Sequence, residues 1–410
     1  MKKQFIFLTL LSALVLGSCN TPVTPSNSNG TETSEESAAS IALSSVTEPE
    51  SLDPDNQPEN DIHSELQYKY LADEWTSITT YVPKTNASGQ NPGNLSSPRG
   101  LILDFEDVDD ADTYYVEISK NANFEGSKVV TSTEKSYAYK SAEIGTYYYY
   151  RAATSQEGLA TATAKMKASA MIAPRNIEVG GVVNFRDIGG WKTSLVEGAR
   201  IKQGLYYRCG EFNKTNAANA KNITAEGKEL IKELGIKVDI DMRDSYRVTA
   251  LNGVSPASSD DWELEVVNGS IPSGTESTRF SGFADVYKRI FDKIAEADEA
   301  PIALHCANGA DRTGIVCFFL LALLGASEED CGRDYSFTRF AGERDVDHTV
   351  EFDGWMSATK ALEGDTLAEK MKNHLLSKGI EEETLVTNQK GGDTYGNGIF
   401  DQMQKTVLQV

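Results

Sequence analysis

The segment PIALHCANGADRTGIVCFFLLALLGA, residues 301–326, gives the clearest structural signal in the chain. Its first five residues form a short apolar run that is typical of a buried strand. The run from Thr313 to Ala326 is apolar almost throughout and predicts an α-helix. Because this run is shorter than the roughly 20 residues needed to cross a bilayer, we expect a core helix. Small and polar residues connect the two elements.

This connecting loop combines the features of an oxyanion site. In an α/β sheet, ligands bind beyond the carboxyl ends of the strands, where the free N–H groups of a following helix attract anions. Ala307, Gly309 and Ala310 let the backbone approach an anion closely, and Arg312 offers a planar fork that matches two phosphate oxygens. The same groups favour a thiolate at Cys306. The loop is therefore predicted to bind a phosphate and to present a thiolate to its phosphorus.

Helical and strand patterns alternate from Ile172 onward. The stretch TAEGKELIKELGIKVDIDMRD, residues 224–244, begins with a capping threonine, continues with a helical apolar stripe and ends in a strand pattern after Gly235. The stretch SGFADVYKRIFDKIAEA, residues 281–297, predicts a second amphipathic helix. This alternation predicts the α/β fold class, with a central parallel or mixed sheet flanked by helices.

The spacing Cys-x5-Arg in the loop resembles that of the cysteine-dependent protein tyrosine phosphatases. The full run, His-Cys-x-x-Gly-x-x-Arg-Thr-Gly, lies between the predicted strand and helix. Further segments occur in the order found in a bacterial branch of that superfamily, which includes atypical tyrosine, dual-specificity and phosphoinositide phosphatases. They are VNFRDIGGW (183–191), GLYYRCGEF (204–212), VDIDMRD (238–244) and LLALLGASEEDCGRDYSFT (320–338). We therefore expect a catalytic domain over residues 172–410.

The resemblance implies a mechanism in which Cys306 attacks phosphorus and forms a phosphocysteine. Arg312 and the loop amides would stabilise the transition state. The chain has no Trp-Pro-Asp tripeptide, which supplies the general acid in many relatives. In the bacterial branch the acid can be the aspartate just before the loop arginine, which is Asp311 here; the alternative is that Asp311 only caps the helix. Thr313 would bond the Cys306 sulfur, cap the helix, or do both.

The resemblance also implies supporting roles for residues around the loop. His305 is expected to be structural and to orient the loop backbone. Four charged residues lie at turns or strand ends, from which they would either reach the site or brace the loop as buried ion pairs: Arg186, Asp187, Asp241 and Arg243. The phosphate-binding residues implied by the motif are Ala307, Asn308, Gly309, Ala310, Thr313 and Gly314.

One position departs from the bacterial branch. Ala310 stands where that branch often has a lysine that grips multiply charged substrates, and no residue between Cys306 and Arg312 is basic. This favours phosphotyrosine or a simple aryl monoester over a phosphoinositide or inositol phosphate. The second possibility stays open because basic residues from elsewhere in the chain can line the rim; the candidates are Lys192, Arg200 and Arg247.

Residues 65–171 show a β pattern. The stretches Gly100–Val108 and Ala111–Ser119 alternate between apolar and polar residues, and Thr146–Thr154 is a tyrosine-rich strand candidate. Short strands at this spacing indicate a sandwich. The residues around Tyr114 and the Gly-Thr-Tyr at 145–147 resemble a fibronectin type III-like module. We expect a spacer or a protein-contact role for it.

The first residues carry an export signal. Lys2 and Lys3 precede an apolar stretch from Phe5 to Leu16, and LGSC at 16–19 resembles a bacterial lipobox. Residues 1–19 are therefore predicted to be a lipoprotein signal peptide, with Cys19 as the lipidated residue and the protein anchored to the extracytoplasmic face of the cell envelope. An ordinary signal peptide is the alternative. Residues 20–64 have the composition of a disordered acidic linker.

The composition narrows the choice of partners. A net charge of −22 argues against a nucleic-acid partner, because contacts with phosphates need a basic face. Cys209, Cys317 and Cys331 lack CxxC or histidine spacing, so no metal or other cofactor is indicated. The expected partner is a phosphorylated protein or a small phosphomonoester. Arsenate reduction or sulfur transfer, and a surface protein that binds phosphate without catalysis, are the competing hypotheses from other classes.

Overall fold

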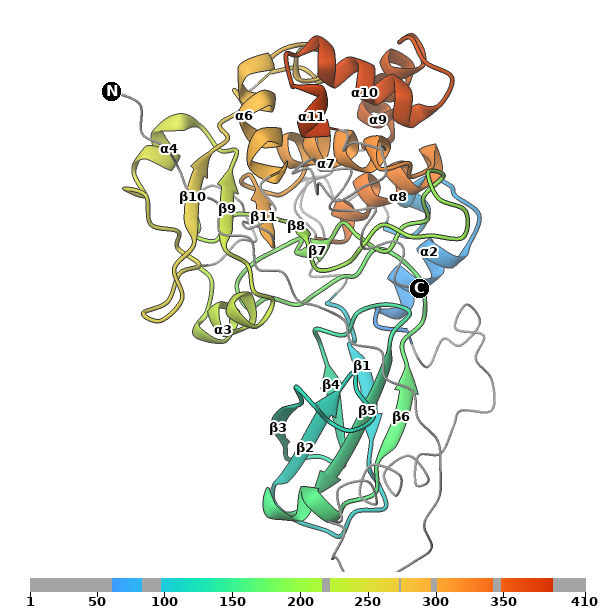
Figure 1. Ribbon diagram of the computed structural model, residues 1–410, viewed down its shortest axis with the longest axis vertical. Helices are drawn as coiled ribbons and strands as arrows, with labels where there is room; N and C mark the ends of the chain where they lie inside the picture. Colours follow the sequence, from blue (N-terminus) through green and yellow to red (C-terminus); the bar gives the residue numbers. More distant parts are fainter. Residues whose placement is uncertain are drawn as a thin grey trace, which may run out of the picture.

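The computed structural model describes residues 61–82, 97–215, 222–272, 274–295, 301–341 and 348–385 (Figure 1). The predicted signal peptide, Cys19 and the linker before Asp61 lie outside these residues, as does the chain after Leu385. In the described part, no helix has both the length and the apolar character needed to cross a membrane.

A five-stranded sheet forms the centre of the C-terminal part. Its strand order is β10-β9-β11-β8-β7, with all neighbours parallel except β7, which runs antiparallel to β8. The prediction of a mixed sheet is therefore confirmed. Residues Ile302–His305 form β11, which is fully buried in the middle of the sheet as its apolar sequence predicted. The other strands are β7 (Arg186–Asp187), β8 (Tyr206–Cys209), β9 (Val238–Asp241) and β10 (Glu265–Asn268).

Helices cover both faces of this sheet (Figure 1). Residues Ala225–Glu233 form α3 on one face, with Thr224 capping the Gly227 amide at 3.0 Å as the sequence predicted. Residues Asp311–Leu323 form α7 on the other face, and it is buried on all sides from Thr313 onward. The remaining helices here are α4 (Ser245–Thr249), α5 (Glu276–Ser281), α6 (Ala284–Ala295), α8 (Glu328–Phe337), η6 (Thr338–Ala341), α9 (His348–Lys360), α10 (Leu367–Ser377) and α11 (Glu382–Leu385).

Two antiparallel sheets form a separate module between residues 101 and 168. One has the order β3-β2-β5-β6 and the other pairs β1 with β4. The Phe105 and Tyr114 rings contact across the module at 5.4 Å, and the Tyr150 hydroxyl donates to the Asp104 carbonyl at 3.0 Å. Its likeness to a fibronectin type III module stays a prediction. The elements are β1 (Leu101–Asp104), β2 (Tyr114–Ser119), β3 (Lys128–Ser132), β4 (Ser136–Tyr139), β5 (Tyr147–Ala153), η4 (Glu157–Thr161) and β6 (Lys165–Ala168).

The expectation that the β pattern starts at Glu65 is wrong. Residues Glu65–Ala72 form α2, which begins at a capping box between Ser64 and Gln67, and Ile78–Thr80 form η3. This segment packs on the C-terminal part, because Arg333 donates to the Tyr70 carbonyl at 2.5 Å. The chain therefore contributes one helix to the C-terminal part before it builds the β module.

The β module docks at the amino-terminal edge of the parallel strands. Arg175 donates to the Ala142 carbonyl at 3.1 Å, and Gln203, just before β8, donates to the Ile144 carbonyl at 3.0 Å. Figure 1 shows the module on the side of the sheet away from α4. The carboxyl ends of β8, β9 and β11 therefore face away from the module.

Candidate active site

The Cys-x5-Arg loop lies between the carboxyl end of β11 and the first turn of α7. This is the position that the sequence predicted for an oxyanion site. Gly309 has a φ of +64°, and a Cβ atom there would lie 2.3 Å from the Cys209 carbonyl oxygen. Glycine therefore lets the loop backbone rest directly on the end of β8.

Cys306 is buried, with 3% of its surface exposed, and its thiol is more acidic than usual. Burial alone would raise the pKa of Cys306. The charge of Arg312 and the nearby hydroxyl and amide of Thr313 outweigh burial, so the net shift of the pKa is downward, although the nearby Asp311 carboxylate opposes it. The loop therefore favours a thiolate, as the sequence predicted.

Arg312 is held at the mouth of the loop by the segment that follows β9. Its Nη1 donates to the Met242 carbonyl at 3.2 Å and lies 3.5 Å from Oδ1 of Asp244. Asp311 and Arg312 are both partly exposed in the first turn of α7, whereas Thr313 and Gly314 are buried. Arg312 and part of the Asp311 side chain therefore reach the surface at the start of α7.

His305 is fully buried at the carboxyl end of β11. Its Nδ1 lies 3.2 Å from the Cys306 carbonyl oxygen, and its Nε2 lies 2.8 Å from Asp239 and 3.8 Å from Asp241. Burial lowers the pKa of His305, but the two carboxylates outweigh it and raise the pKa to about 9. The raised pKa favours the imidazolium form, whose Nδ1–H can donate to the Cys306 carbonyl.

This ion pair predicts a pH-dependent stability. The pKa of His305 rises from an unfolded value of 6.5 to about 9 in the fold, so its contribution is complete below pH 6.5 and is lost as the pH rises through about 9. The contribution to the unfolding free energy is on the order of 3 kcal/mol. Denaturant unfolding from pH 6 to 10 measures it. His305→Gln carries no titrating proton there, so its stability should decline less with rising pH; equal declines would contradict the prediction.

Two residues that the sequence analysis did not select support the loop from below. Asn184 donates to the carbonyls of Asn308 and Gly309 at 3.1 and 3.0 Å, and Arg208 donates to the Gly309 carbonyl at 2.7 Å. These bonds occupy loop carbonyls on the underside. They help the loop amides to point outward, toward a bound anion.

Asp334 on α8 joins this support to Arg186 on β7. Arg186 donates to one Asp334 carboxylate oxygen at 2.9 Å, and Arg208 donates to the other at 2.5 Å. Burial alone would raise the pKa of Asp334, but the two guanidiniums hold it below its usual range. Arg208 and Asp334, like Arg186, lie in the segments that resemble the phosphatase family. That resemblance is the sequence signal by which Arg208 and Asp334 could have been selected.

The four charged candidates from the sequence are all buried in ion pairs. Arg186 braces the loop through Asp334, while Asp241 pairs with Arg243 at 2.6 Å beside His305. Asp187 is different, because it pairs with Arg175 at 3.3 Å next to the β module. Three of the four therefore lie around the loop and Asp187 does not.

The three proposed rim cations are spread apart. Arg247 pairs with Asp244 at 3.7 Å and so lies near Arg312. Lys192 lies beside Gly325 and Ala326, beyond the C-terminal end of α7. Arg200 pairs with Lys192 in an isolated antiparallel β-bridge, so it lies there too. Because α7 has 13 residues, that end is roughly 20 Å from the loop. Only Arg247 of the three is placed at the mouth.

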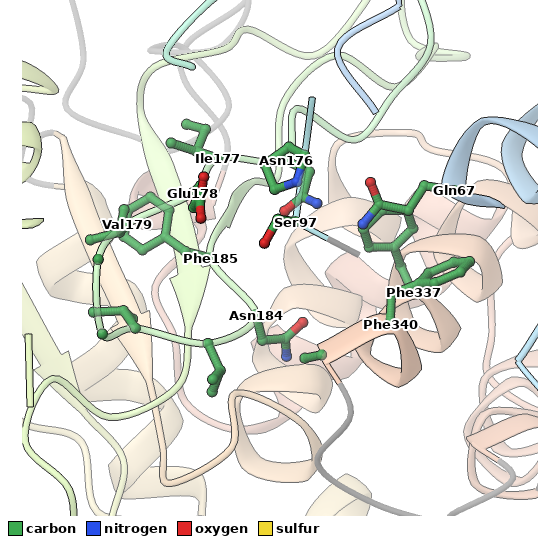
Figure 2. Close-up of a pocket in the computed structure, with 16 residues that line it drawn as sticks. Gln67, Ser97, Asn176, Ile177, Glu178, Val179, Asn184, Phe185, Phe337 and Phe340 are labelled. Atoms are coloured by element: carbon green, nitrogen blue, oxygen red, sulfur yellow. The ribbon is translucent and has the colours of Figure 1, made fainter. Parts of the chain in front are cut away.

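Figure 2 shows a pocket of about 420 Å³ behind the loop. Residues 176–185 line it together with Phe337 and Phe340, and Asn184 on this wall donates to the loop carbonyls of Asn308 and Gly309. No residue from Cys306 to Arg312 lines this pocket. It therefore differs from the site in front of the nucleophile.

The remaining cysteines are free thiols. Cys209, Cys317 and Cys331 are buried and make no disulfide in the part of the chain that the structure describes. Burial raises the pKa of Cys317 to about 12 and that of Cys209 well above its ordinary value. Of the four thiols that the structure describes, only that of Cys306 has a pKa below its ordinary value.

Comparisons with known proteins agree with this geometry. Residues 177–378 match the model of the tyrosine phosphatase family. A tyrosine-protein phosphatase of Nostoc commune is 24% identical over 136 residues, which are 30% of this chain and 46% of that protein. A protein of Cupriavidus necator named as a tyrosine-protein phosphatase is 26% identical over 175 residues, 38% of this chain and 59% of its own.

The chain thus spans about half the length of these two relatives. The matched region begins just before β7 and contains the loop, the five-stranded sheet and the supporting ion pairs. Residues 177–378 are therefore the part of this chain that is similar to the tyrosine phosphatase family.

Proposed function

We propose that the chain is a cysteine-dependent phosphatase that hydrolyses phosphomonoesters through a phosphocysteine intermediate. The observation that carries the proposal is the environment of Cys306, which is buried at the N-terminus of α7 with a lowered pKa beside Arg312. A thiolate and an anion site in one loop bring nucleophile and phosphorus together. Both relatives are named as phosphatases.

The reaction has two displacements at phosphorus. In the first, the Cys306 thiolate forms an S–P bond as the ester P–O bond breaks, and Asp311 gives its proton to the departing oxygen. In the second, Asp311 takes a proton from water, whose oxygen attacks phosphorus and breaks the S–P bond. Arg312 and the amides of residues 307–311 hold the three equatorial oxygens throughout. Inorganic phosphate leaves and the thiolate is restored.

The position of Asp311 supports the role of general acid over that of a helix cap. Ala310 is the cap residue of α7 and provides no side-chain hydrogen bond, while Asp311 is the first helical residue. Asp311 is partly exposed, although its Oδ1 is buried, and its charge raises the pKa of Cys306. This nearness to the nucleophile supports a role in proton transfer at the phosphorus centre.

The proposed substrate is a phosphotyrosine residue or another simple phosphomonoester, with dual specificity included. Phosphoinositides or inositol phosphates are the alternative. They carry several phosphates and need several cations at the rim, but only Arg247 of the three rim candidates lies there, and it is paired with Asp244. The placement of the cations thus favours a substrate with a single phosphate.

The remaining parts of the proposal concern location and the β module. We propose export and lipid anchoring at Cys19 from the sequence of residues 1–19. Because the module docks at the amino-terminal edge of the strands, it leaves the mouth of the loop open. A spacer or protein-contact role for the module fits this placement.

Turnover and trapping of the intermediate test the enzymatic proposal. We expect the full chain to hydrolyse para-nitrophenyl phosphate under reducing conditions. After rapid acid quenching, peptide mass spectrometry should find one phosphate on the Cys306 peptide and none on the peptides of Cys317 or Cys331. If the chain binds phosphotyrosine but never releases phosphate, the domain is a non-catalytic phosphate-binding protein. Phosphate release without a cysteine adduct would overturn the covalent mechanism.

A further inference from the structure

A segment outside the phosphatase-like region packs against that region. This segment, residues 61–82, contains α2 and η3 and is called the N-terminal strap below. It precedes the matched residues 177–378, and the β module lies between the two in the chain. Figure 1 shows α2 beside α8. The family likeness therefore assigns no role to the strap.

Two side-chain contacts fix the strap to α8. Arg333 donates through Nη1 to the Tyr70 carbonyl at 2.5 Å and through Nη2 to the Asp73 carbonyl at 2.6 Å. These carbonyls lie at the C-terminal end of α2, where the helix itself leaves them without partners. Trp75 packs directly on Gly332, where a Cβ atom would lie 2.2 Å from the indole ring. The strap and α8 therefore touch backbone to side chain in both directions.

Buried apolar side chains extend the same contact to η6. The Tyr70 ring is fully buried, and its centroid lies 5.7 Å from that of Phe340. Arg339 donates to the Val82 carbonyl at 2.8 Å, at the end of the strap. The shared apolar cluster contains Tyr70, Ile78, Val82, Phe337 and Phe340. Releasing the strap would expose this surface to water, so the contact is favourable.

The same two elements, α8 and η6, also hold the residues that support the phosphate loop. Asp334 on α8 accepts a hydrogen bond from Arg208, and Thr338 on η6 accepts one from Asn184 at 3.3 Å. Arg208 and Asn184 in turn donate to the Gly309 carbonyl. A continuous set of contacts therefore runs from the strap through α8 and η6 to the loop.

We propose that the N-terminal strap is a positioning element of the phosphate loop and that it acts through Arg333 and Trp75 on α8. This inference rests on the proposed phosphate-binding function of the loop. Without these contacts α8 and η6 shift, and Arg208 and Asn184 hold the loop carbonyls less firmly. The loop amides then converge less well on an anion. Substitutions along such packed networks change a coupled site by about two- to thirtyfold.

The first test measures the loop without turnover, in full chains kept reduced. Arg333→Gln and Trp75→Ala should each weaken the binding of inorganic phosphate by about two- to thirtyfold in calorimetry. Both should also slow the alkylation of Cys306 by iodoacetamide at pH 6, measured on its peptide by mass spectrometry, because a less ordered loop stabilises the thiolate less. Trp75→Phe keeps a smaller ring on α8, so it should give a smaller effect of the same sign.

Glu329→Gln is the matched control for these variants. It removes the ion pair that Arg333 makes within α8 at 2.7 Å and leaves both bonds from Arg333 to the strap. This variant should bind phosphate and react with iodoacetamide as wild type does. A loss equal to that of Arg333→Gln would assign the effect to α8 itself and would contradict the role of the strap.

Hydrogen exchange of the α2 amides in the same samples shows whether the strap is released. Faster exchange together with weaker phosphate binding and slower alkylation supports the inference. Faster exchange with an unchanged loop would overturn it, and so would α2 amides that stay protected in Arg333→Gln and Trp75→Ala. None of these readouts needs turnover. A wild-type chain that binds phosphate but hydrolyses no ester would therefore refute the enzymatic proposal and leave this inference standing.

Discussion

Replacing Cys306 by serine should lower kcat for para-nitrophenyl phosphate by about 10⁴-fold or more. The physical reason is the loss of the thiolate. The loop lowers the pKa of the Cys306 thiol, so more of the nucleophile is present as thiolate than for an ordinary cysteine. A serine hydroxyl remains protonated in the same environment and is a poor nucleophile. Steady-state hydrolysis with both chains at equal concentration measures the change.

Cys317→Ala is the control for this experiment. Cys317 lies in the same helix as the end of the loop and is fully buried, but burial raises its pKa to about 12. The control variant should keep most of the activity. The Cys306→Ser chain should still bind vanadate or phosphate, because Arg312 and the loop amides are unchanged. A Cys306→Ser variant that retains more than a few per cent of the activity would contradict nucleophilic catalysis by this residue.

Replacing Asp311 by asparagine should produce a loss that depends on the leaving group. With an alkyl phosphate, whose leaving oxygen is strongly basic, kcat should fall by about 10²- to 10⁴-fold, because no group donates the proton. With para-nitrophenyl phosphate, whose leaving oxygen is stable as an anion, the first step should fall by less than about tenfold. A series of substituted phenyl phosphates measures this dependence on leaving-group acidity.

The pH profile provides a second readout for Asp311. The pH dependence of kcat for an alkyl phosphate should differ between wild type and Asp311→Asn, because the asparagine can neither donate nor accept the proton. Asp244→Asn is a matched control at the same mouth, because Asp244 contacts Arg312 but would transfer no proton in the proposed reaction. A uniform loss with every leaving group, and an unchanged pH profile, would mean that Asp311 only shapes the loop.

The local sequence determined the chemistry-bearing strand, loop and helix. The loop residues from His305 to Gly314 are contiguous, and their structure follows from an apolar strand, small residues and an apolar helix in direct succession. The same holds for α3, whose cap at Thr224 and stop near Gly235 are both local signals. Such features depend on neighbours within a few residues, so a single sequence shows them.

The supporting residues depend on contacts between distant segments. Asn184 and Arg208 donate to the Gly309 carbonyl, which lies more than 90 residues away in the sequence. Asp334, on α8, accepts a hydrogen bond from Arg208. Nothing within any one of these segments says which carbonyl or carboxylate it meets. Asp187 shows the same limit, because its sequence neighbour Arg186 braces the loop while Asp187 itself pairs with Arg175 near the β module.

By itself the sequence determined the α/β class and was enough to propose the phosphate loop with Cys306 as its nucleophile, because these rest on periodicity and on residues that are adjacent in the chain. Only the tertiary structure decided that α2 packs beside α8, that the β module docks away from the carboxyl ends of the strands and that Asp244 lies beside Arg312. The reason is physical. Burial and ion pairing between distant segments are set by how the sheet stacks those segments, and that stacking is a property of the whole fold.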